Sequence, residues 1–249
     1  MLTIIIVNYN SLDYLYKNLK SISDSNLSDI KYEIIIIDNN SYKKPDQNKL
    51  LKFNAKLFLL DDNFGYSKAL NYGVKYSSGK YILALNPDIL LKSNTIINLY
   101  NYYKDNDIGV VGPKILNIDG TFQVSSRRRF PFIKNILPLI INGRKKYNYL
   151  DYDNNIIKEV DSISGSCMLF SKKIYDKVKG FDEQFFLYFE DTDFCLRVKE
   201  LGYKVIYFPA TEAFHFKYGS RKINNYLLVK FEFYKSFIKF TKKYLSSNF

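Results

Sequence analysis

The strongest constraint on the fold is the alternation of apolar, β-branched runs with helical patterns over the first hundred residues. Residues 2–7 and 32–37 are apolar runs typical of strands buried on both faces. Shorter strands are expected at 56–60 and 81–85, and helices at 12–22, at 66–76 and from Ser93 onward. This order predicts an α/β domain with a largely parallel sheet, which binds ligands beyond the carboxyl ends of its strands.

The second half of the sequence is less regular. Short strands are predicted at 109–113, 121–124, 166–170 and 204–208, with a helix at 193–201 that ends before Gly202. Residues 126–146 are basic, contain Pro131 and Pro138, and read as a mobile loop. One long helix is expected from Arg221 to the end.

Composition narrows the class of protein. A chain of 249 residues with 47% apolar and 25% charged residues buries a substantial core, which excludes disorder as its main state. Its apolar runs are far shorter than the ~20 residues of a membrane span, and no signal peptide is recognised. The two cysteines lie far apart and suggest neither a disulfide scaffold nor a zinc site. We expect a cytoplasmic protein.

The chain is strongly basic, with 37 Lys and Arg against 25 Asp and Glu and a net charge of +12. Such an excess favours an anionic partner, which is a nucleic acid, a membrane surface or a phosphorylated ligand. A composition biased toward Lys, Asn, Ile, Tyr and Phe explains the total charge equally well.

Short polar residues follow each of the first four predicted strands. They are the segments 8–10, 38–41, 61–66 and 86–88. Asp, Asn and Gly at a single strand end are most often turn formers. Four such ends in succession, all at the ligand-binding edge, favour a nucleotide site.

Three carboxylates cluster at the start of the helix predicted near residue 193. Glu190, Asp191 and Asp193 follow an aromatic run. The helix dipole favours acidic residues in a first turn, which explains one or two of them. A carboxylate among aromatic side chains suits a general base that takes a proton from a sugar hydroxyl.

Taken together, these motifs resemble the inverting family 2 glycosyltransferases of the GT-A fold, and most closely the rhamnosyltransferase-like branch. The resemblance covers residues 1–220 and rests on an ordered set of segments: 6–10, 36–41, 63–71, 85–88, 126–131, 165–169, 181–197, and His215 with 219–220 after it. It implies an α/β, GT-A type fold with a Rossmann-like mixed central sheet flanked by helices. The expected domain spans 1–220, with a nucleotide-binding half (1–113) and an acceptor half (114–220), followed by a C-terminal amphipathic helical tail (221–249).

The resemblance also assigns roles to individual residues. It implies Asp191 as catalytic base, with Glu190 as second choice, and a Mg²⁺ or Mn²⁺ ion held by Asp88 and His215. Asn86 stands where the family's metal motif usually has its first Asp, which leaves the strictness of metal dependence open. The donor nucleotide sugar would be bound by Asn8, Tyr9, Asn10, Asp38, Asn40, Asn63, Gly65, Lys68, Asn71, Asn86 and Asp88.

Two basic segments are expected to face the acceptor side. Arg127, Arg128 and Arg129, with Tyr188, are predicted to contact the acceptor or a phosphate, since Arg forms forked contacts to phosphate. The tail at 222–245 combines an aromatic stripe with lysines. It is predicted either to bind the inner face of the cytoplasmic membrane as a peripheral anchor or to pack on protein.

The function implied is transfer of a sugar, with inversion, to a glycan or a polyprenyl-diphosphate-linked acceptor in bacterial surface polysaccharide synthesis. The favoured donor is dTDP-rhamnose, followed by a UDP-hexose. The alternatives are a non-catalytic nucleotide- or carbohydrate-binding relative, a sugar nucleotidyltransferase and a basic nucleic-acid-binding protein. No nucleic-acid motif is recognised, so no nucleic acid is expected. The oligomeric state, including a homodimer, is left open.

Overall fold

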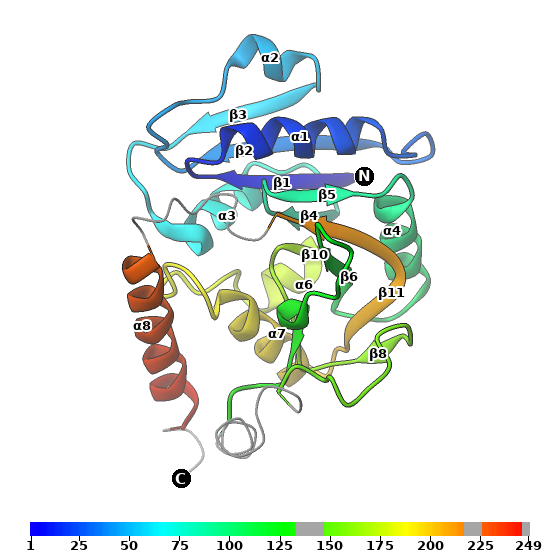
Figure 1. Cartoon of the computed structure of the whole chain (residues 1–249), viewed down its shortest axis with the longest axis vertical. Helices are drawn as coiled ribbons and strands as arrows, with labels where there is room; N and C mark the ends of the chain where they lie inside the picture. Colours follow the sequence, from blue (N-terminus) through cyan, green and yellow to red (C-terminus); the bar gives the residue numbers. More distant parts are fainter. Residues whose placement is uncertain (133–146, 217–225, 246–249) are drawn as a thin grey trace.

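The computed structural model describes residues 1–132, 147–216 and 226–245, which form a mixed sheet with helices on both faces (Figure 1). The strands are β1 (Leu2–Asn8), β2 (Tyr32–Asp38), β3 (Ala55–Leu59), β4 (Tyr81–Leu85), β5 (Ile89–Leu91), β6 (Val110–Asn117), β7 (Arg127–Arg128), β8 (Lys158–Glu159), β9 (Ser162–Ile163), β10 (Cys167–Ser171) and β11 (Val205–His215). The helices are α1 (Leu12–Ser23), α2 (Gln47–Leu51), α3 (Gly65–Lys75), α4 (Thr95–Asp105), α6 (Lys172–Lys177), α7 (Glu190–Glu200) and α8 (Tyr226–Leu245), with a 3₁₀ turn at Val124–Ser126.

The main sheet has the strand order β3-β2-β1-β4-β10-β6-β11-β5, with β8 beside β11, while β7 and β9 form a separate pair. The apolar runs in β1 and β2 are continuous because alternate side chains enter two different cores. Ile5 and Ile35 face the core that includes α3, whereas Ile4 and Ile34 face the core that includes α1. The sheet is therefore covered on both faces, as the sequence predicts.

Parallel pairing brings the first strand ends together. Asn8 of β1 lies in register with Asp38 of β2, and Ile6 of β1 with Leu85 of β4. The residues that follow these strands consequently share one edge of the sheet.

An antiparallel strand, β10, lies between β4 and β6 and makes the sheet mixed. Cys167 pairs with Leu85, so the segment before β10 lies beside the segment after β4. The Asn86 amide donates to the Ser166 carbonyl at 2.9 Å. The second half of the chain thus reaches the edge where the first-half strands end.

Two sequence-based expectations need correction. The strand predicted at 121–124 is wrong, because the turn at Asp119 and Gly120 leaves only a single bridge between Phe122 and Leu116 before the 3₁₀ turn. Strands β6 and β11 extend beyond their predicted ends, because they pair with each other across a bulge between Phe208 and Glu212. Most of the predicted mobile loop (133–146) and the expected start of the tail helix (221–225) lie outside the described residues.

Helix α8 packs along one side of the domain through a defined inner face (Figure 1). Phe240 is buried against Phe189, and the Ser236 hydroxyl donates to the Leu187 carbonyl at 2.8 Å. Within the described residues, no helix is long and apolar enough to cross a membrane.

A buried carboxylate fixes the far end of α8. Asp193 of α7 has no solvent exposure, and its Oδ1 accepts from Lys243 Nζ and from the Tyr244 hydroxyl, each at 2.6 Å. Its Oδ2 accepts from Arg197 at 2.6 and 2.8 Å. Buried charges are tolerated only when they are paired and hydrogen-bonded in this way.

Replacing Asp193 with Ala leaves Arg197 and Lys243 facing each other without their shared carboxylate. We expect the free energy of unfolding to fall by about 3 kcal/mol, since removing one partner of a buried ion pair strands the other. Urea denaturation of the full chain measures this. Glu200→Ala, at the exposed end of the same helix, is the matched control, and equal stability of the two variants would contradict the expectation.

Candidate active site

The ends of β1 and β2 are joined by buried polar side chains. Asn8 Nδ2 donates to Asp38 Oδ2 at 2.7 Å and to Ser41 Oγ at 3.1 Å. Asp38 has no solvent exposure, and its Oδ1 accepts from the Ser41 amide at 3.0 Å and lies 3.3 Å from Lys44 Nζ. Both Asp38 oxygens are thus held by protein groups, and this carboxylate shapes the turn.

Asn8 Oδ1 differs from its neighbours. Among the described residues, this buried amide oxygen has no hydrogen-bond partner. Buried acceptors are normally satisfied, so an unpaired oxygen at a strand end marks a position that a ligand N–H or O–H fits. Asn8 thus keeps an acceptor that is not used, whereas both Asp38 oxygens are already bound by protein groups.

Three further predicted donor-binding residues lie at the surface of these turns. Tyr9 is 38% exposed, while Asn10 and Asn40 adopt left-handed backbone angles with φ of 53° and 63°. Asn10 Oδ1 accepts from the Tyr42 amide at 2.9 Å, and Asn40 Oδ1 accepts from Lys44 at 2.9 Å. The Asn10 and Asn40 side chains thus stabilise the turns, while the Tyr9 side chain is partly exposed beside them.

The loop before α3 is held by a residue that the sequence analysis did not select. Asn39 Nδ2 donates to Asn63 Oδ1 at 2.8 Å and to the Gly65 carbonyl at 3.2 Å. Gly65 has φ +81°, and an added Cβ would lie 2.5 Å from the Phe186 carbonyl oxygen. Only glycine fits this contact, which joins the first half of the chain to the segment before α7. Its position directly after Asp38, at the end of a predicted strand, is the feature of the sequence that could have identified Asn39.

Two predicted donor-binding residues lie elsewhere, and this corrects the prediction. Lys68 is exposed and covers the Phe64 ring at 4.1 Å from its centroid. The Asn71 amide bonds to Phe181 N and O, to the Tyr175 hydroxyl and to Glu183, at 2.8–3.0 Å. Because its hydrogen-bonding capacity is filled, Asn71 ties α3 to the loop after α6.

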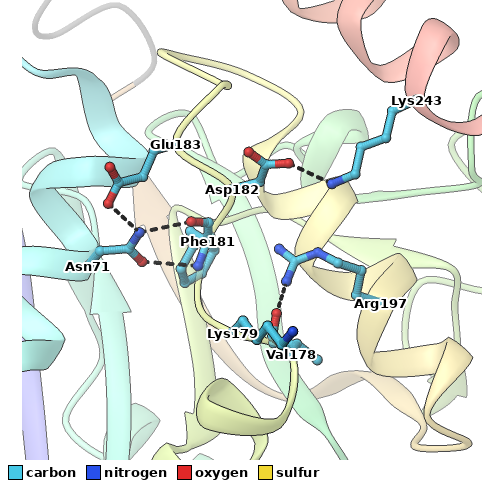
Figure 2. Close-up of a pocket in the computed structure, with 8 residues that line it drawn as sticks. All are labelled: Asn71, Val178, Lys179, Phe181, Asp182, Glu183, Arg197 and Lys243. Carbon is cyan, nitrogen blue, oxygen red and sulfur yellow. Dashed lines mark hydrogen bonds and ion pairs between the residues drawn. The ribbon is translucent and has the colours of Figure 1, made fainter.

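Asn71 also lines a hollow of about 410 Å³ on this side of the molecule (Figure 2). Lys243, Asp182 and Arg197, which line it, are bound by other protein groups. Lys243 bonds to Asp182 at 2.6 Å, and Arg197 donates to the Val178 carbonyl. None of the strand-end residues lines it, so the hollow is not the predicted nucleotide site.

At the end of β4, Asp88 meets His215, the last residue of β11. The distance from His215 Nε2 to Asp88 Oδ1 is 3.2 Å, and both side chains are largely buried. The other ring nitrogen, Nδ1, lies 3.0 Å from Oε1 of the buried Gln123. The sequence analysis did not identify Gln123, because this residue lies in no recognised motif. Its side chain fixes the orientation of the His215 ring from the side opposite Asp88. Asn86, between β4 and Asp88, is half-buried.

Two consecutive residues with left-handed backbone angles set the direction in which α7 begins. Tyr188 and Phe189 have φ of 69° and 67°, unusual values for aromatic residues. They are packed by α8, with Phe233 5.6 Å from the Tyr188 ring and 5.3 Å from the Phe189 ring. Backbone strain of this kind persists only where the surroundings hold it and clusters at functional sites.

Asp191 is held by three donors. Its Oδ2 accepts from Arg128 at 2.6 Å and from the Gly165 amide at 2.9 Å, and its Oδ1 accepts from the Thr192 amide at 2.7 Å. Together with a second bond from Thr192, whose hydroxyl donates to Oδ1 at 3.2 Å, these contacts fix the orientation of the carboxylate. In return, the Asp191 carboxylate raises the pKa of Arg128 against the opposing effect of burial.

Glu190, the residue directly before Asp191, lies in an environment that favours the neutral carboxyl. Burial first, and then the adjacent Asp191 carboxylate, raise the pKa of Glu190 well above its usual range. Its Oε2 is buried and has no partner among the described residues. Of the two acidic side chains, Glu190 is therefore the one whose protonated form the surroundings favour.

Tyr66 shows that the predicted catalytic and metal-binding residues are neighbours. Its hydroxyl donates to the Gly165 carbonyl at 3.1 Å. Burial raises the pKa of Tyr66, and the nearby carboxylates of Glu190, Asp191 and Asp88 raise it further. The Gly165 amide binds Asp191, and the Ser166 carbonyl accepts from the Asn86 amide, so the segment that Tyr66 contacts connects the two predicted sites. The sequence analysis included Tyr66 in the segment 63–71 that carries the family resemblance but gave it no role.

The three consecutive arginines do not act together, which corrects the prediction for two of them. Arg127 is fully buried, and its guanidinium donates to the Tyr149 carbonyl at 3.0 Å and lies 4.4 Å from the Tyr207 ring centroid. Arg129 packs on the Tyr149 ring at 4.1 Å and pairs with Asp151 at 3.6 Å. Strand geometry turns alternate side chains to opposite faces, so only Arg128 reaches Asp191.

Comparison with known proteins defines the class. The sequence model of glycosyl transferase family 2 matches residues 3–179, and that of glycosyl transferase family group 2 matches residues 146–245. The chain belongs to glycosyl transferase family 2 and is a glycosyltransferase of the rhamnosyltransferase-like type.

Particular relatives span nearly the whole chain. It is 28% identical over 255 residues to the low-salt glycan biosynthesis hexosyltransferase Agl10 of Haloferax volcanii, covering 99% of this chain and 75% of the relative. It is 29% identical over 234 residues to the rhamnosyltransferase WbbL of Escherichia coli K12, covering 89% and 86%. Glycan and polysaccharide biosynthesis is the shared setting.

The fold matches solved GT-A glycosyltransferases. The mannosyltransferase PcManGT of Pyrobaculum calidifontis, solved with GDP-Man and Mn²⁺, superposes with a TM-score of 0.62 at 17% identity. The match covers 86% of this chain and 56% of that protein, so this chain spans about half of its length. This likeness confirms the predicted GT-A type fold.

The raised pKa of Glu190 makes stability depend on pH in a defined direction. The folded protein keeps a proton that the unfolded chain releases above about pH 4.5, so the contribution of this carboxyl to stability is lost as pH rises through the folded pKa. Glu190→Gln stays neutral throughout. We therefore expect its Tm, relative to the wild type, to rise between pH 5 and pH 9 in metal-free buffer. Glu200→Gln should show a flat difference, and a flat difference for Glu190→Gln would contradict the assignment.

Proposed function

We propose that this protein transfers a sugar from a nucleotide-sugar donor to a hydroxyl group of a glycan or lipid-linked acceptor, with inversion at the anomeric carbon. The observation that carries the proposal is that two groups meet at residues Gly165 and Ser166, where the Gly165 amide binds Asp191 and the Ser166 carbonyl accepts from the Asn86 amide. Asp191, from the acceptor half, and the Asp88–His215 pair, from the strand ends, lie at one edge of the sheet. Single displacement needs a base on one side and positive charge at the leaving group on the other.

Asp191 is the proposed base. In the transfer, the acceptor oxygen forms the new bond to the anomeric carbon, its proton passes to the Asp191 carboxylate, and the bond to the nucleoside diphosphate breaks. Arg128 and the Gly165 amide hold this carboxylate in a fixed orientation. Glu190, protonated at neutral pH, is suited to donate a hydrogen bond rather than to accept a proton.

The residues at the end of β4 fit a divalent cation. Asp88 Oδ1 and His215 Nε2 are 3.2 Å apart, close to the about 3 Å expected between adjacent ligands of an octahedral Mg²⁺ site with bonds near 2.1 Å. Asp88 and His215 would hold the ion, and the donor diphosphate would complete its shell, since the described residues contain no cluster of three or more His, Cys, Asp or Glu side chains. Bound there, Mg²⁺ or Mn²⁺ supplies positive charge to the departing diphosphate.

The donor and acceptor follow from the family branch. The resemblance to rhamnosyltransferases, among them WbbL, supports dTDP-rhamnose as donor, with a UDP-hexose next in view of the hexosyltransferase Agl10. The proposed acceptor is a glycan or a polyprenyl-diphosphate-linked sugar. The division into halves at 113 and 114, and the placement of the reaction at the inner face of the cytoplasmic membrane, stay predictions.

A thermal-shift panel of dTDP, UDP, GDP and their sugars, with and without Mn²⁺, tests donor and metal binding. A nucleotide at about 100 times its Kd adds roughly 2.7 kcal/mol of stability, a readily measured rise in Tm. We expect one nucleotide class to stabilise the protein, Mn²⁺ to increase the effect, and Asp88→Ala to remove the Mn²⁺ increment. Asp61→Ala, at an exposed strand end, should keep it. A folded protein that responds to no nucleotide would favour the nucleic-acid-binding or non-catalytic alternatives.

Asp191→Asn tests the base. A positioned base contributes about 10²–10⁴ in rate, so we expect the transfer rate to fall by that factor while donor binding in the thermal-shift panel is retained. The measurement is release of nucleoside diphosphate with a lipid-diphosphate-linked sugar as acceptor. Asp176→Asn, an exposed residue of α6, is the control. Transfer at close to the wild-type rate by Asp191→Asn would remove Asp191 from this role.

A further inference from the structure

Helix α8 has an outer face that its own domain leaves uncovered. Phe231, Tyr234 and Ile238 are 62%, 61% and 53% exposed and lie three and four residues apart, so they form one stripe, here called the outer stripe. Figure 1 shows α8 at the edge of the molecule, with the rest of the described domain along one of its sides. Large apolar side chains gathered on one exposed helix face mark an interaction surface more often than scattered ones do.

The inner face of α8 fixes the direction in which the outer stripe points. Ser236, Phe240 and Lys243 bind Leu187, Phe189 and Asp193 on the opposite side of the helix. Because these contacts are buried and polar as well as apolar, α8 cannot rotate to bury the outer stripe without breaking them. Among the described residues, the stripe therefore has no element of its own domain to cover it.

Charge identifies the kind of partner. The exposed lysines Lys230, Lys235 and Lys242 accompany the outer stripe. The acidic residue of the described part of α8, Glu232, is only partly exposed and lies 3.3 Å from Lys235. An aromatic and aliphatic stripe with lysines beside it is the pattern of a helix that lies in the interface of an anionic bilayer.

A second copy of the chain fits this face less well. In a two-fold symmetric contact each patch meets itself, which would bring the lysines of both helices together. Stable dimer contacts also involve about 20–30 residues on each side, whereas the outer stripe offers three large apolar side chains.

We propose that the outer stripe of α8 and its lysines dock on an anionic lipid surface. Docking would set the distance from the bilayer to the catalytic residues, because Ser236 binds Leu187, three residues before Glu190. The advantage of docking to the enzyme rests on the proposed function, because a polyprenyl-linked acceptor would be presented at the same lipid surface. The docking itself needs no donor or acceptor.

Co-sedimentation of the full chain with vesicles tests the proposal. We expect binding to phosphatidylcholine vesicles containing 30% phosphatidylglycerol, little binding to pure phosphatidylcholine, and loss of binding in high salt. The triple variant Phe231→Ser, Tyr234→Ser, Ile238→Ser should lower the partition coefficient at least tenfold. The lysine variant Lys230→Gln, Lys235→Gln, Lys242→Gln should lower it about 100-fold, because each basic residue near an anionic surface contributes about fivefold.

The matched control removes an equal number of exposed apolar side chains elsewhere. Tyr42, Leu51 and Leu59 are 94%, 68% and 55% exposed, and their replacement by Ser should leave vesicle binding unchanged. Each variant is first shown to keep its Tm and its nucleotide-induced shift, so that failure of docking is distinguished from failure of the proposed function. The proposal is overturned if the wild type ignores anionic vesicles, if the outer-stripe variant binds like the control, or if light scattering shows a dimer that this variant dissociates.

Discussion

The site depends on the close approach of Gly165 to Asp191. The Gly165 amide donates to Asp191 Oδ2 at 2.9 Å, and an added Cβ at Gly165 would lie 3.3 Å from the Asp191 Cβ. The neighbouring Ser166 carbonyl accepts from Asn86, and the Gly165 carbonyl accepts from Tyr66. One short segment before β10 thus connects the end of β4, the loop at the start of α3 and the start of α7. This turn leads directly into β10, which pairs with β4, so backbone pairing positions the proposed base relative to the proposed metal-binding residues.

The first turn of α7 is positioned from the other side by α8. Tyr188 and Phe189 hold left-handed backbone angles while packed against Phe233, and Asp193 is enclosed by Arg197, Lys243 and Tyr244. The inner face of the tail helix therefore contributes to the precision of the site, and its outer stripe remains exposed. The two alternatives that the sequence offered for the tail, packing on protein and binding a membrane, describe opposite faces of one helix.

The sequence predicted those parts of the fold that depend on local pattern. The runs in β1 and β2, and the polar residues after them, follow from side-chain periodicity and from the geometry of parallel strands. Long-range pairing was less accessible: the extension of β11 to His215 depends on β6 beside it. The same limit applies to the site. Arg127 and Arg128 are indistinguishable in sequence, yet one is buried against Tyr207 and the other binds Asp191. Asn71 lay in a recognised segment but one turn too far along α3 to face the strand ends.

Charge balance explains why these particular carboxylates share a site that must accept a diphosphate. Three ionised carboxylates around Tyr66 would repel a doubly charged leaving group in a medium of low dielectric constant. Arg128 compensates Asp191, and His215 lies against Asp88. Glu190 carries no charge at neutral pH, because burial and Asp191 raise its pKa. Asn86, in place of an acidic residue, removes one more negative charge. Asp88 is then the carboxylate that is left to bind a cation. The donor diphosphate would supply much of the cation's coordination, so we expect metal and nucleotide to bind cooperatively.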